Sequence, residues 1–415
     1  MALTRGPAPL LPVAEARARI CAAMRVLPKE TVGIAHAIGR VLATDVVARV
    51  TQPPLAVSAM DGYAVRAADV ARVPTTLTQV GEVQAGAIYQ GAIAAGETVR
   101  IFTGAPLPTG ADAIVIQEDT TAEGTRITVN ESAAQGRYVR PAGLDFTVGT
   151  VGIEAGKRLS PRDIGLAAAM NVPWLEVRRR PRVALLATGD EIVRPGEPVG
   201  PGQIVSSNAL AMAAVLSENG ADPIDLGIAL DNRESLAQMA QGVRGADLLI
   251  TMGGASVGEH DLVRAVLGER GLAIDFWQIA MRPGKPLMFG TLDGIPMIGV
   301  PGNPVSSLVC ALVFVVPAIR ALLGLAAAAA PDTIGARLGA ALPANDRRED
   351  YLRATLDPGD NGIWVATPFA TQDSSMLSTL AAATGLIVRP PLAPAAAAGD
   401  RVAVIPLPGT ASPAI

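Results

Sequence analysis

The chain of 415 residues contains little cysteine, histidine or lysine, and each shortage excludes a class of protein or site. Two cysteines, Cys21 and Cys310, allow at most one disulfide, which excludes a small secreted domain held together by several disulfides. Only His36 and His260 stand beside them, so a zinc site of the Cys/His type lacks ligands. Any metal is therefore expected to be a hard ion bound through oxygen.

The charge and hydropathy of the chain exclude further classes. The formal net charge is -4, without the basic excess of a non-specific nucleic-acid binder. The N-terminus lacks the basic start and apolar stretch of a signal peptide, so we expect a cytoplasmic protein. The most apolar segment is residues 308–330, whose uninterrupted run (308–316) is shorter than the ~18–20 residues that span a bilayer. We expect a buried core helix there, and neither a membrane nor a nucleic acid as partner.

The composition predicts several domains. Half of the residues are apolar and 17% are charged, and at ~150 residues per domain the length suggests about three domains. Helical patterns at 13–24 and 161–170 indicate a helical and linker domain, whereas short strands separated by turns indicate β structure. The predicted domains are residues 1–50 with 142–180 (helical and linker), 51–141 (inserted, β-rich), 181–328 (α/β) and 329–415 (a β-barrel or sandwich).

Strands and helices alternate through the predicted α/β domain. The expected strands are 183–187, 223–229, 247–251, 273–279, 287–289 and 296–300, and the expected helices are 209–219, 233–243, 260–270 and 305–323, the last with a kink at Pro317. Alternation of this kind predicts a mainly parallel, doubly wound sheet covered by helices on both faces, which is a three-layer fold.

The loops after the parallel strands carry the polar residues that suit a ligand. They are residues 188–191, 231–232, 252–261 and 301–307, and ligands bind at this edge of an open parallel sheet. Glycine lets backbone N–H groups approach an anion, and the nearby carboxylates suit Mg²⁺. Together these loops predict a site for a phosphate group held with Mg²⁺. Each loop alone is better explained as a tight connection in which Asp190 or Asp231 caps a helix, and it is the four loops together that favour a ligand site.

A further loop, residues 281–286, carries two cations between two prolines. Lysine occurs at only three positions, Lys29, Lys157 and Lys285, so Lys285 in this loop favours a positioned charge for an oxyanion. The alternative is a solvated surface turn. His260 is expected to be a surface residue, and two histidines do not support a Ser-His-Asp triad.

Six motifs follow one another along the chain. They are Ser-Ala-Met-Asp-Gly-Tyr-Ala-Val at 58–65, Arg-Ile-Phe-Thr-Gly-Ala-Pro at 100–106, Thr-Gly-Asp-Glu at 188–191, Gly-Gly-Ala-Ser-Val-Gly-Glu at 253–259, Arg-Pro-Gly-Lys-Pro at 282–286 and Pro-Gly-Asn-Pro at 301–304. In this order they resemble the molybdopterin molybdenumtransferases, the MoeA and gephyrin E-domain family, over nearly the whole chain. The Gly-Gly and Pro-Gly-Asn-Pro loops also occur in related pterin-binding proteins, whereas the first motif is typical of this branch.

The resemblance implies a fold and a reaction. The implied fold is an elongated homodimer with a helical and β N-terminal part, a pterin-binding α/β domain and a C-terminal β-barrel. In the implied reaction, adenylylated molybdopterin and molybdate give molybdenum cofactor and AMP, with Mg²⁺ as cofactor. The implied partners are a second copy of the chain, the two substrates, the upstream molybdopterin adenylyltransferase and the acceptor molybdoenzymes.

The resemblance also implies site residues, taken from the matching motifs. In this family the active site lies between the α/β domain of one subunit and the N-terminal part of the other, to which Asp61, Thr103 and Asp145 belong. The implied catalytic residues are Asp61, Thr103, Asp145, Glu191, Asp231 and Lys285, and the implied Mg²⁺ ligands are Asp190, Glu191 and Asp231. The implied substrate-binding residues are Asp190, Gly253, Gly254, Ser256, Asp261, Arg282, Pro301, Gly302, Asn303, Pro304, Ser306, Arg348 and Ser374.

Some positions depart from the family pattern. Met252 stands where serine is usual, Gln278 and Arg282 stand where lysine is common, Leu144 replaces a glutamate, and Asp373 replaces a glycine. A lost cation weakens oxyanion binding, since each charge-assisted contact is worth roughly 1.5–3 kcal/mol. The acidic set is complete, so an active transferase is the leading hypothesis. The alternatives are a non-catalytic molybdopterin carrier or scaffold, and a nucleotide hydrolase or amidase, against which the motifs at 58–65 and 100–106 argue.

Overall fold

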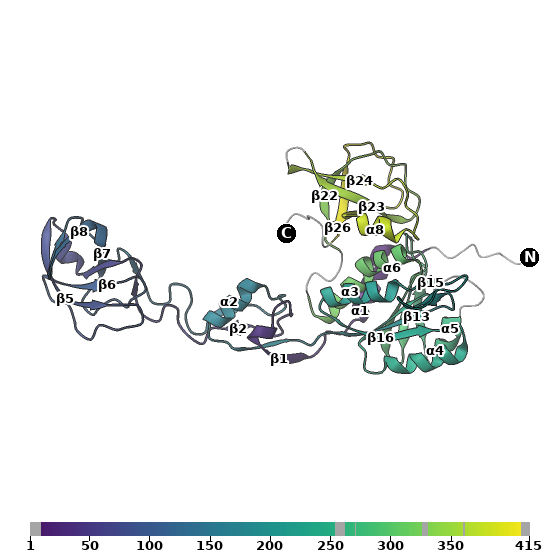
Figure 1. Cartoon of the computed structure of the whole chain (residues 1–415), viewed down its shortest axis with the longest axis horizontal. Helices are drawn as coiled ribbons and strands as arrows, with labels where there is room; N and C mark the ends of the chain where they lie inside the picture. The colour runs from purple at the N-terminus through teal and green to yellow at the C-terminus, as the bar shows by residue number, and fades with distance from the viewer. Residues whose placement is uncertain (1–9, 254–261, 270, 326–330, 360–361, 408–415) are drawn as a thin grey trace, which may run out of the picture. The chain divides into compact units, whose positions relative to one another are not determined.

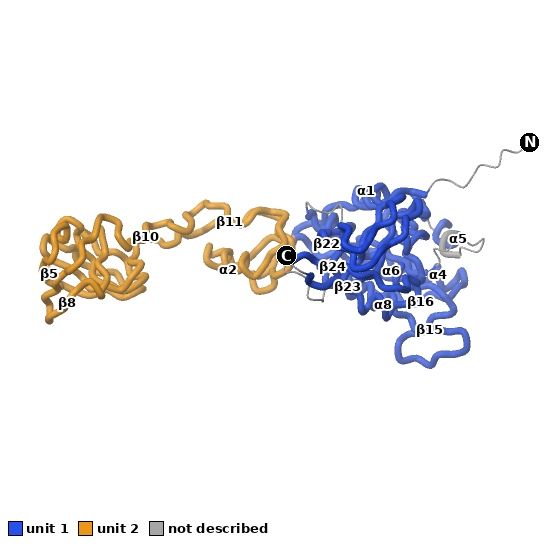
Figure 2. The backbone as a smooth tube through the Cα atoms, turned by 90° about the horizontal axis from the view of Figure 1, so that it is seen from above, with its two compact units in different colours: residues 1–30, 178–415 blue, residues 31–177 orange. Residues whose placement is uncertain are grey.

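The computed structural model describes residues 10–253, 262–269, 271–325, 331–359 and 362–407. The chain divides into two compact units, which Figure 2 shows in blue and orange. Unit 1 comprises Met1–Glu30 with Arg178–Ile415, and unit 2 comprises Thr31–Val177. The N-terminal helix α1 (Val13–Ala23) belongs to unit 1, where it packs against helix α7 (Val316–Leu322), whereas the sequence groups it with residues 142–180.

A six-stranded sheet in the order β16-β13-β17-β21-β20-β18 forms the centre of unit 1. The first four strands are mutually parallel, and β20 and β18 add antiparallel pairings at one edge. This result confirms the mainly parallel sheet. The strands are β13 (Arg182–Thr188), β16 (Asp222–Ala229), β17 (Leu248–Met252), β18 (Ala273–Trp277), β20 (Met288–Leu292) and β21 (Ile295–Val300).

Helices cover both faces of this sheet and make three layers (Figure 1). On one face, Ala184 and Leu186 of β13 pack in a buried cluster with Leu236 and Leu267. Those two residues belong to helices α4 (Arg233–Met239) and α5 (Leu262–Gly268). Helices α3 (Asn208–Glu218) and α6 (Pro304–Cys310) lie on the opposite face. The doubly wound arrangement follows from strands that are apolar on both faces.

The apolar segment near residue 310 is a core helix. It runs from Pro304 to Leu322, and 78% of its most apolar window is buried inside the protein. A π-helical turn (Ala311–Val315) lies between α6 and α7, and Pro317 is in the first turn of α7. Proline removes one backbone donor, and a π turn just before it shifts the hydrogen-bond pattern to accommodate the loss.

The C-terminal residues form a closed five-stranded barrel. The strand order β23-β24-β22-β26-β25 closes through a β23–β25 pairing, and a buried cluster fills the interior. A short strand from the α/β part, β19 (Met281–Arg282), adds to β23 in parallel. The barrel strands are β22 (Ile334–Leu338), β23 (Glu349–Pro358), β24 (Trp364–Pro368), β25 (Gly385–Arg389) and β26 (Arg401–Pro406), with helix α8 (Leu377–Ala382) beside them.

Unit 2 contains a six-stranded mixed sheet in the order β7-β4-β6-β5-β9-β8. Buried clusters cover both of its faces. The strands are β4 (Gly62–Val65), β5 (Thr75–Val83), β6 (Glu97–Ile101), β7 (Ala113–Ile116), β8 (Thr120–Glu123) and β9 (Arg126–Val129). The short strands expected in this part of the chain are confirmed.

The second part of unit 2 is built around helix α2 (Pro161–Ala169). Ser160 caps its start: the Ser160 N–H and hydroxyl both donate to Asp163, at 2.8 and 2.7 Å. Burial alone raises the pKa of Asp163, but hydrogen bonds from Lys157 and Ser160 outweigh it and lower the pKa to about 2. The helix packs on the short strand pair of β2 (Val46–Val47) with β11 (Val151–Ile153). A second short pair joins β3 (Val57–Ser58) with β10 (Val139–Arg140). The helix expected at 161–170 is confirmed.

Candidate functional site

The carboxyl ends of the parallel strands bring four predicted loops to one edge of the unit 1 sheet. Strands β13, β16, β17 and β21 run in the same direction, so the loops that start at Gly189, Leu230, Gly253 and Pro301 all leave from that edge. Strand β18 also runs in this direction, because two antiparallel pairings separate it from β21. The loop that carries Arg282 and Lys285 therefore starts from the same edge.

Asp190 and Asp231 meet at this edge. The backbone N–H of Asp231 donates to Asp190 Oδ1 at 2.9 Å. Partial burial, followed by the negative charges of Asp190 and Glu191, raises the pKa of Asp231. The helix cap that follows is Asn232, whose Oδ1 accepts from the Ser235 N–H at 2.9 Å. Asp231 is thus not needed as a cap, and its carboxylate is available to a cation.

The predicted Mg²⁺ ligands Asp190, Glu191 and Asp231 do not form a complete metal site by themselves. Within the described ranges, no three Asp, Glu, His or Cys side chains are spaced as a complete metal site. Asp190, Glu191 and Asp231 lie close enough to affect one another's charge but do not by themselves enclose an ion. Mg²⁺ in proteins is commonly held by one or two carboxylates together with substrate phosphates, and this arrangement fits that pattern.

Glycine backbone and buried hydroxyl groups lie near the carboxyl ends of these strands. A Cβ atom on Gly253 would lie 2.6 Å from the backbone oxygen of Thr188 and 2.9 Å from its Oγ1, so a side chain is excluded there. The hydroxyls of Thr188, Thr251 and Ser307 are buried without a hydrogen-bond partner among the described residues. Burying unpaired hydroxyls is unfavourable, so a polar ligand that reaches them gains hydrogen bonds.

The loop after β21 joins the barrel to this edge. Asn303 Nδ2 donates to Ser374 Oγ at 3.0 Å, and the Val305 N–H donates to the Ser374 carbonyl at 3.3 Å. Asn208 Nδ2 donates to the Gly302 carbonyl at 2.7 Å. Of the residues expected in this loop, Pro301 directly follows β21, Pro304 starts α6 and Ser306 is buried in its first turn. The structure therefore brings the predicted residues Asn303 and Ser374 together.

Arg282 is bound by the acidic residues of the barrel. Its guanidinium contacts Asp350 and lies 3.5 Å from Asp346 Oδ2, and Arg348 binds the same Asp346 at 2.6 Å. Arg348 holds the pKa of Asp346 near 2, whereas burial raises the pKa of Asp350. Lys285 lies in the same loop and is exposed. The two predicted cations thus differ: Arg282 is ion-paired, and Lys285 is accessible to solvent.

The remaining sequence-predicted positions of unit 1 lie in the loop after β17 and around Ser374. Gly254, Ser256, Asp261 and also His260 lie outside the described residues. Met252, at the end of β17, is buried and offers an apolar contact in place of a hydroxyl. Asp373 stabilises the turn around Ser374, because its Oδ1 accepts from the Ser375 N–H and hydroxyl at 2.8 and 2.6 Å.

Asp61 and Thr103 form a pair in unit 2. Thr103 donates to Asp61 Oδ1 from its backbone N–H at 2.7 Å and from its hydroxyl at 2.8 Å. These two bonds, the backbone one first, lower the pKa of Asp61. Both side chains are exposed, so they are accessible to a ligand. Asp145 is exposed in another turn, where its N–H donates to the Gln52 carbonyl at 3.0 Å.

Arg100 is a residue of this neighbourhood that the predicted site omits. Its guanidinium carbon lies 5.0 Å from the ring centroid of Tyr63 and 5.1 Å from that of Phe102. The only sequence signal was its place at the start of the motif at 100–106. A cross-strand stacking partner cannot be read from that position alone.

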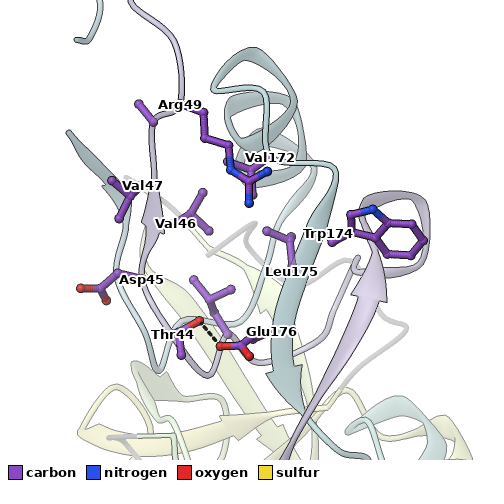
Figure 3. Close-up of a pocket in the computed structure, with 11 residues that line it drawn as sticks. Thr44, Asp45, Val46, Val47, Arg49, Val172, Trp174, Leu175 and Glu176 are labelled. Atoms are coloured by element: carbon purple, nitrogen blue, oxygen red, sulfur yellow. Dashed lines mark hydrogen bonds between the residues drawn. The ribbon is translucent and has the colours of Figure 1, made fainter. Parts of the chain in front are cut away.

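A cavity of about 350 Å³ lies in the second part of unit 2 (Figure 3). Thr44 and Glu176 hydrogen-bond at its rim at 3.0 Å, and Trp174 beside it is 62% exposed. Its lining comprises Leu42, Thr44, Asp45, Val46, Val47, Ala48, Arg49, Val172, Trp174, Leu175 and Glu176. It contains none of the predicted site residues, so it is separate from the Asp61–Thr103 pair.

These features define a class of protein: a multidomain α/β protein whose sheet edge suits a phosphate-bearing ligand, extended by a β-barrel and a mixed β unit. Models of known families identify it further. The MoeA N-terminal region (domain I and II) matches residues 11–171, a probable molybdopterin binding domain matches residues 184–321, and the MoeA C-terminal region (domain IV) matches residues 335–407. The chain belongs to the molybdopterin molybdenumtransferase (MoeA) family, which confirms the resemblance.

Individual relatives agree over almost the whole length. The molybdopterin molybdenumtransferase of Nostoc sp. is 38% identical over 91% of this chain and 89% of its own. Molybdopterin molybdenumtransferase 2 of Mycobacterium tuberculosis is 35% identical over 92% of this chain and 96% of its own. A molybdopterin biosynthesis MoeA structure from Pyrococcus horikosii superposes with a TM-score of 0.84 at 31% identity, covering 97% of this chain and all of that one.

Proposed function

We propose that this protein catalyses molybdenum insertion: adenylylated molybdopterin and molybdate give molybdenum cofactor and AMP. The observation that carries the proposal is that the glycine loops, the carboxylates and the loop with the two cations all start from one edge of the sheet. The chain is also similar to named molybdopterin molybdenumtransferases over almost its whole length. The reaction needs a dithiolene held beside a tetrahedral dianion while a pyrophosphate link is cut. Fixing the reactants together lowers the barrier by several kcal/mol, on the order of the gains known for oriented reactions.

The sheet edge divides into two proposed ligand positions. Gly253 and the Thr188 hydroxyl beside it suit a phosphate-bearing ligand, because backbone and hydroxyl donors can approach it closely. Lys285 suits molybdate, since it is an exposed cation on a loop from the same edge. Arg282 acts less directly, because Asp346 and Asp350 compensate its charge.

Mg²⁺ is proposed as the cofactor at the acidic part of this edge. Asp231 is the first candidate ligand, because Asp190 and Glu191 add to the burial that raises its pKa, and a bound cation relieves that repulsion. Mg²⁺ supplies charge neutralisation for phosphate oxygens. Asp190 or Glu191 completes the protein's share of the ligands.

We also propose a cytoplasmic homodimer, with Asp61, Thr103 and Asp145 of one copy acting on the sheet edge of the other. Exposed apolar residues support an interface on unit 2, among them Trp174 at 62% and Val47 at 41% exposure beside the cavity of Figure 3. The upstream molybdopterin adenylyltransferase and acceptor molybdoenzymes are the proposed pathway partners.

The test is AMP release from adenylylated molybdopterin with Mg²⁺, measured with and without molybdate. Molybdate-dependent release is expected, together with transfer of molybdenum to the pterin product. Tight binding of the adenylate without release would instead support a molybdopterin carrier or scaffold. That result would direct attention to Met252 and Gln278, the two positions where a hydroxyl and a cation are missing.

A further inference from the structure

Arg100 is held at a defined position beside the Asp61–Thr103 pair. Besides its two ring contacts, Arg100 donates to Gln117 Oε1 at 2.5 Å and to the Gly62 carbonyl at 3.4 Å. Fixing an arginine side chain on a sheet surface costs rotamer entropy. The four contacts of the Arg100 guanidinium offset this cost and hold the side chain in one conformation.

Three of the four partners of Arg100 are next to the pair or bonded to it. Gly62 directly follows Asp61, and Phe102 directly precedes Thr103. The Gln117 N–H donates to the Asp61 carbonyl at 3.2 Å. Arg100 therefore contacts both chain segments that the Asp61–Thr103 hydrogen bonds join.

The strand register explains why these groups meet. Arg100 of β6 lies directly opposite Tyr63 of β4 in the antiparallel pairing, and Ile101 lies opposite Gly62. Directly opposed residues have Cβ atoms about 4.5–5.5 Å apart, close enough for an arginine to stack on a tyrosine ring. Gly62 cannot carry a side chain, because its Cβ would clash with the backbone oxygen of Val115. The register thus leaves Arg100 stacked over Tyr63, with its guanidinium turned toward the Gly62 carbonyl.

We propose that Arg100 is a positioning residue, which ties strands β4 and β6 to the 3₁₀ turn Gln117–Asp119 and so holds Asp61 and Thr103 in their reactive arrangement. The inference rests on the proposed function, in which Asp61 and Thr103 act on the substrate. Arg100 acts through these two residues and through the chain around them.

The charges around Asp61 give this role a second consequence. The two Thr103 bonds lower the pKa of Asp61, burial opposes them, and the charge of Arg100 lowers it further as the smallest contribution. Tyr63 on β4 stacks on Arg100, and Glu118 and Asp119 lie on the 3₁₀ turn, where Asp119 interacts with Glu131 and Arg137. Removal of Arg100 therefore takes away the cation whose charge acts on Asp61, whereas Asp119 keeps Arg137.

The experiment compares Arg100→Gln and Arg100→Lys in the full chain, with Arg126→Gln on β9 of the same sheet as the matched control. Steady-state AMP release gives kcat and the KM for molybdate across pH, and hydrogen exchange gives the protection of residues 58–65 and 100–106. For Arg100→Gln we expect kcat to fall about 10- to 100-fold with KM within twofold, because small misplacements of reacting groups cost that much.

Two further signatures separate positioning from general destabilisation. In Arg100→Gln the acid limb of the kcat profile moves to higher pH, and Arg100→Lys restores that limb but only part of kcat, since lysine keeps the charge and loses the planar fork. Exchange rises in residues 58–65 and 100–106 and stays unchanged elsewhere. Arg126→Gln behaves like the parent protein in each measurement.

Two results would overturn the inference. Unchanged exchange in both segments of Arg100→Gln would show that Arg100 does not hold the pair. An effect on the KM for molybdate alone would show that it contacts the oxyanion instead. A parent protein that releases no AMP contradicts the proposed function, whereas the exchange measurement still decides whether Arg100 holds Asp61 and Thr103.

Discussion

Asp61 in unit 2 and Asp231 in unit 1 are the same residue type in opposite electrostatic environments. Asp61 accepts two hydrogen bonds from Thr103 and has a neighbouring arginine, and its pKa is lowered. Asp231 is partly buried beside Asp190 and Glu191, and its pKa is raised. Asp61 is thus stabilised in its charged form by the fold itself, whereas the charge on Asp231 is opposed by its surroundings.

The difference indicates a division of roles between the two units. A carboxylate with fixed donors is ready to act as a preorganised base or hydrogen-bond acceptor, because its geometry and its charge are set before substrate arrives. When neighbouring negative charges raise the pKa of a carboxylate, a bound cation stabilises its ionised form most strongly. We infer that unit 2 supplies a positioned anion and that the edge of unit 1 supplies the place for Mg²⁺ and phosphate.

The largest expected effect comes from removing the charge of the positioned anion. Asp61→Asn keeps the side-chain shape but loses the carboxylate, and we expect AMP release to fall about 100-fold or more, in the range found for groups that move protons in the transition state. Glu123→Gln, on strand β8 of the same sheet, is the control and should leave AMP release unchanged. Undiminished release from a folded Asp61→Asn protein would remove Asp61 from the site.

A smaller effect, confined to one substrate, is expected at the unit 1 edge. Lys285→Ala should raise the KM for molybdate about 10- to 100-fold, because a charge-assisted contact is worth roughly 1.5–3 kcal/mol. Release at saturating molybdate should be nearly unchanged. Lys29→Ala removes a lysine remote in sequence from the loop and serves as the control. Equal molybdate dependence in all three proteins would contradict a role for Lys285 in binding the oxyanion.

Much of unit 1 could be predicted from sequence because its signals are local. Strand–helix alternation and the loops after each strand placed Gly189, Asp231 and Asn303 at one edge without knowledge of any long-range contact. The barrel was predicted only as a barrel or sandwich until the resemblance was considered, because closure depends on the β23–β25 pairing. Short alternating strands do not encode which of them pair.

The unpredicted features depend on pairings between distant segments. Arg282 is ion-paired because β19 joins β23 some 70 residues later, which brings it to Asp350. Arg100 stacks on Tyr63 only because β4 and β6 pair in one particular register. The Asp61–Thr103 pair was expected from the family motifs and not from spacing, since its members are 42 positions apart. The local sequence pattern predicts where helices and strands lie along the chain. Ion pairs and stacking contacts between distant residues depend on which strands pair and in which register.

The smallest effect tests the raised pKa of Asp231 directly. Without Mg²⁺, Asp231→Asn should slightly raise the melting temperature at pH 7, because a group with a raised pKa costs stability once it is ionised. With Mg²⁺ at about ten times its Kd, the parent protein should gain about 2–4 °C, and the variant clearly less. In the parent protein this gain should shrink as the pH falls toward the pKa of Asp231, since protons then compete with the metal.

Asp222→Asn, at the amino end of the same strand β16, is the matched control and should keep the full Mg²⁺ response. The test sharpens the comparison of the two aspartates, because Asp61→Asn should behave in the opposite way: its lowered pKa means that its charge favours the fold above the ordinary carboxyl pKa, so that its loss lowers the melting temperature with or without metal. Equal Mg²⁺ responses in the parent and in Asp231→Asn would place the ion elsewhere, and the raised pKa of Asp231 would then have no part in metal binding.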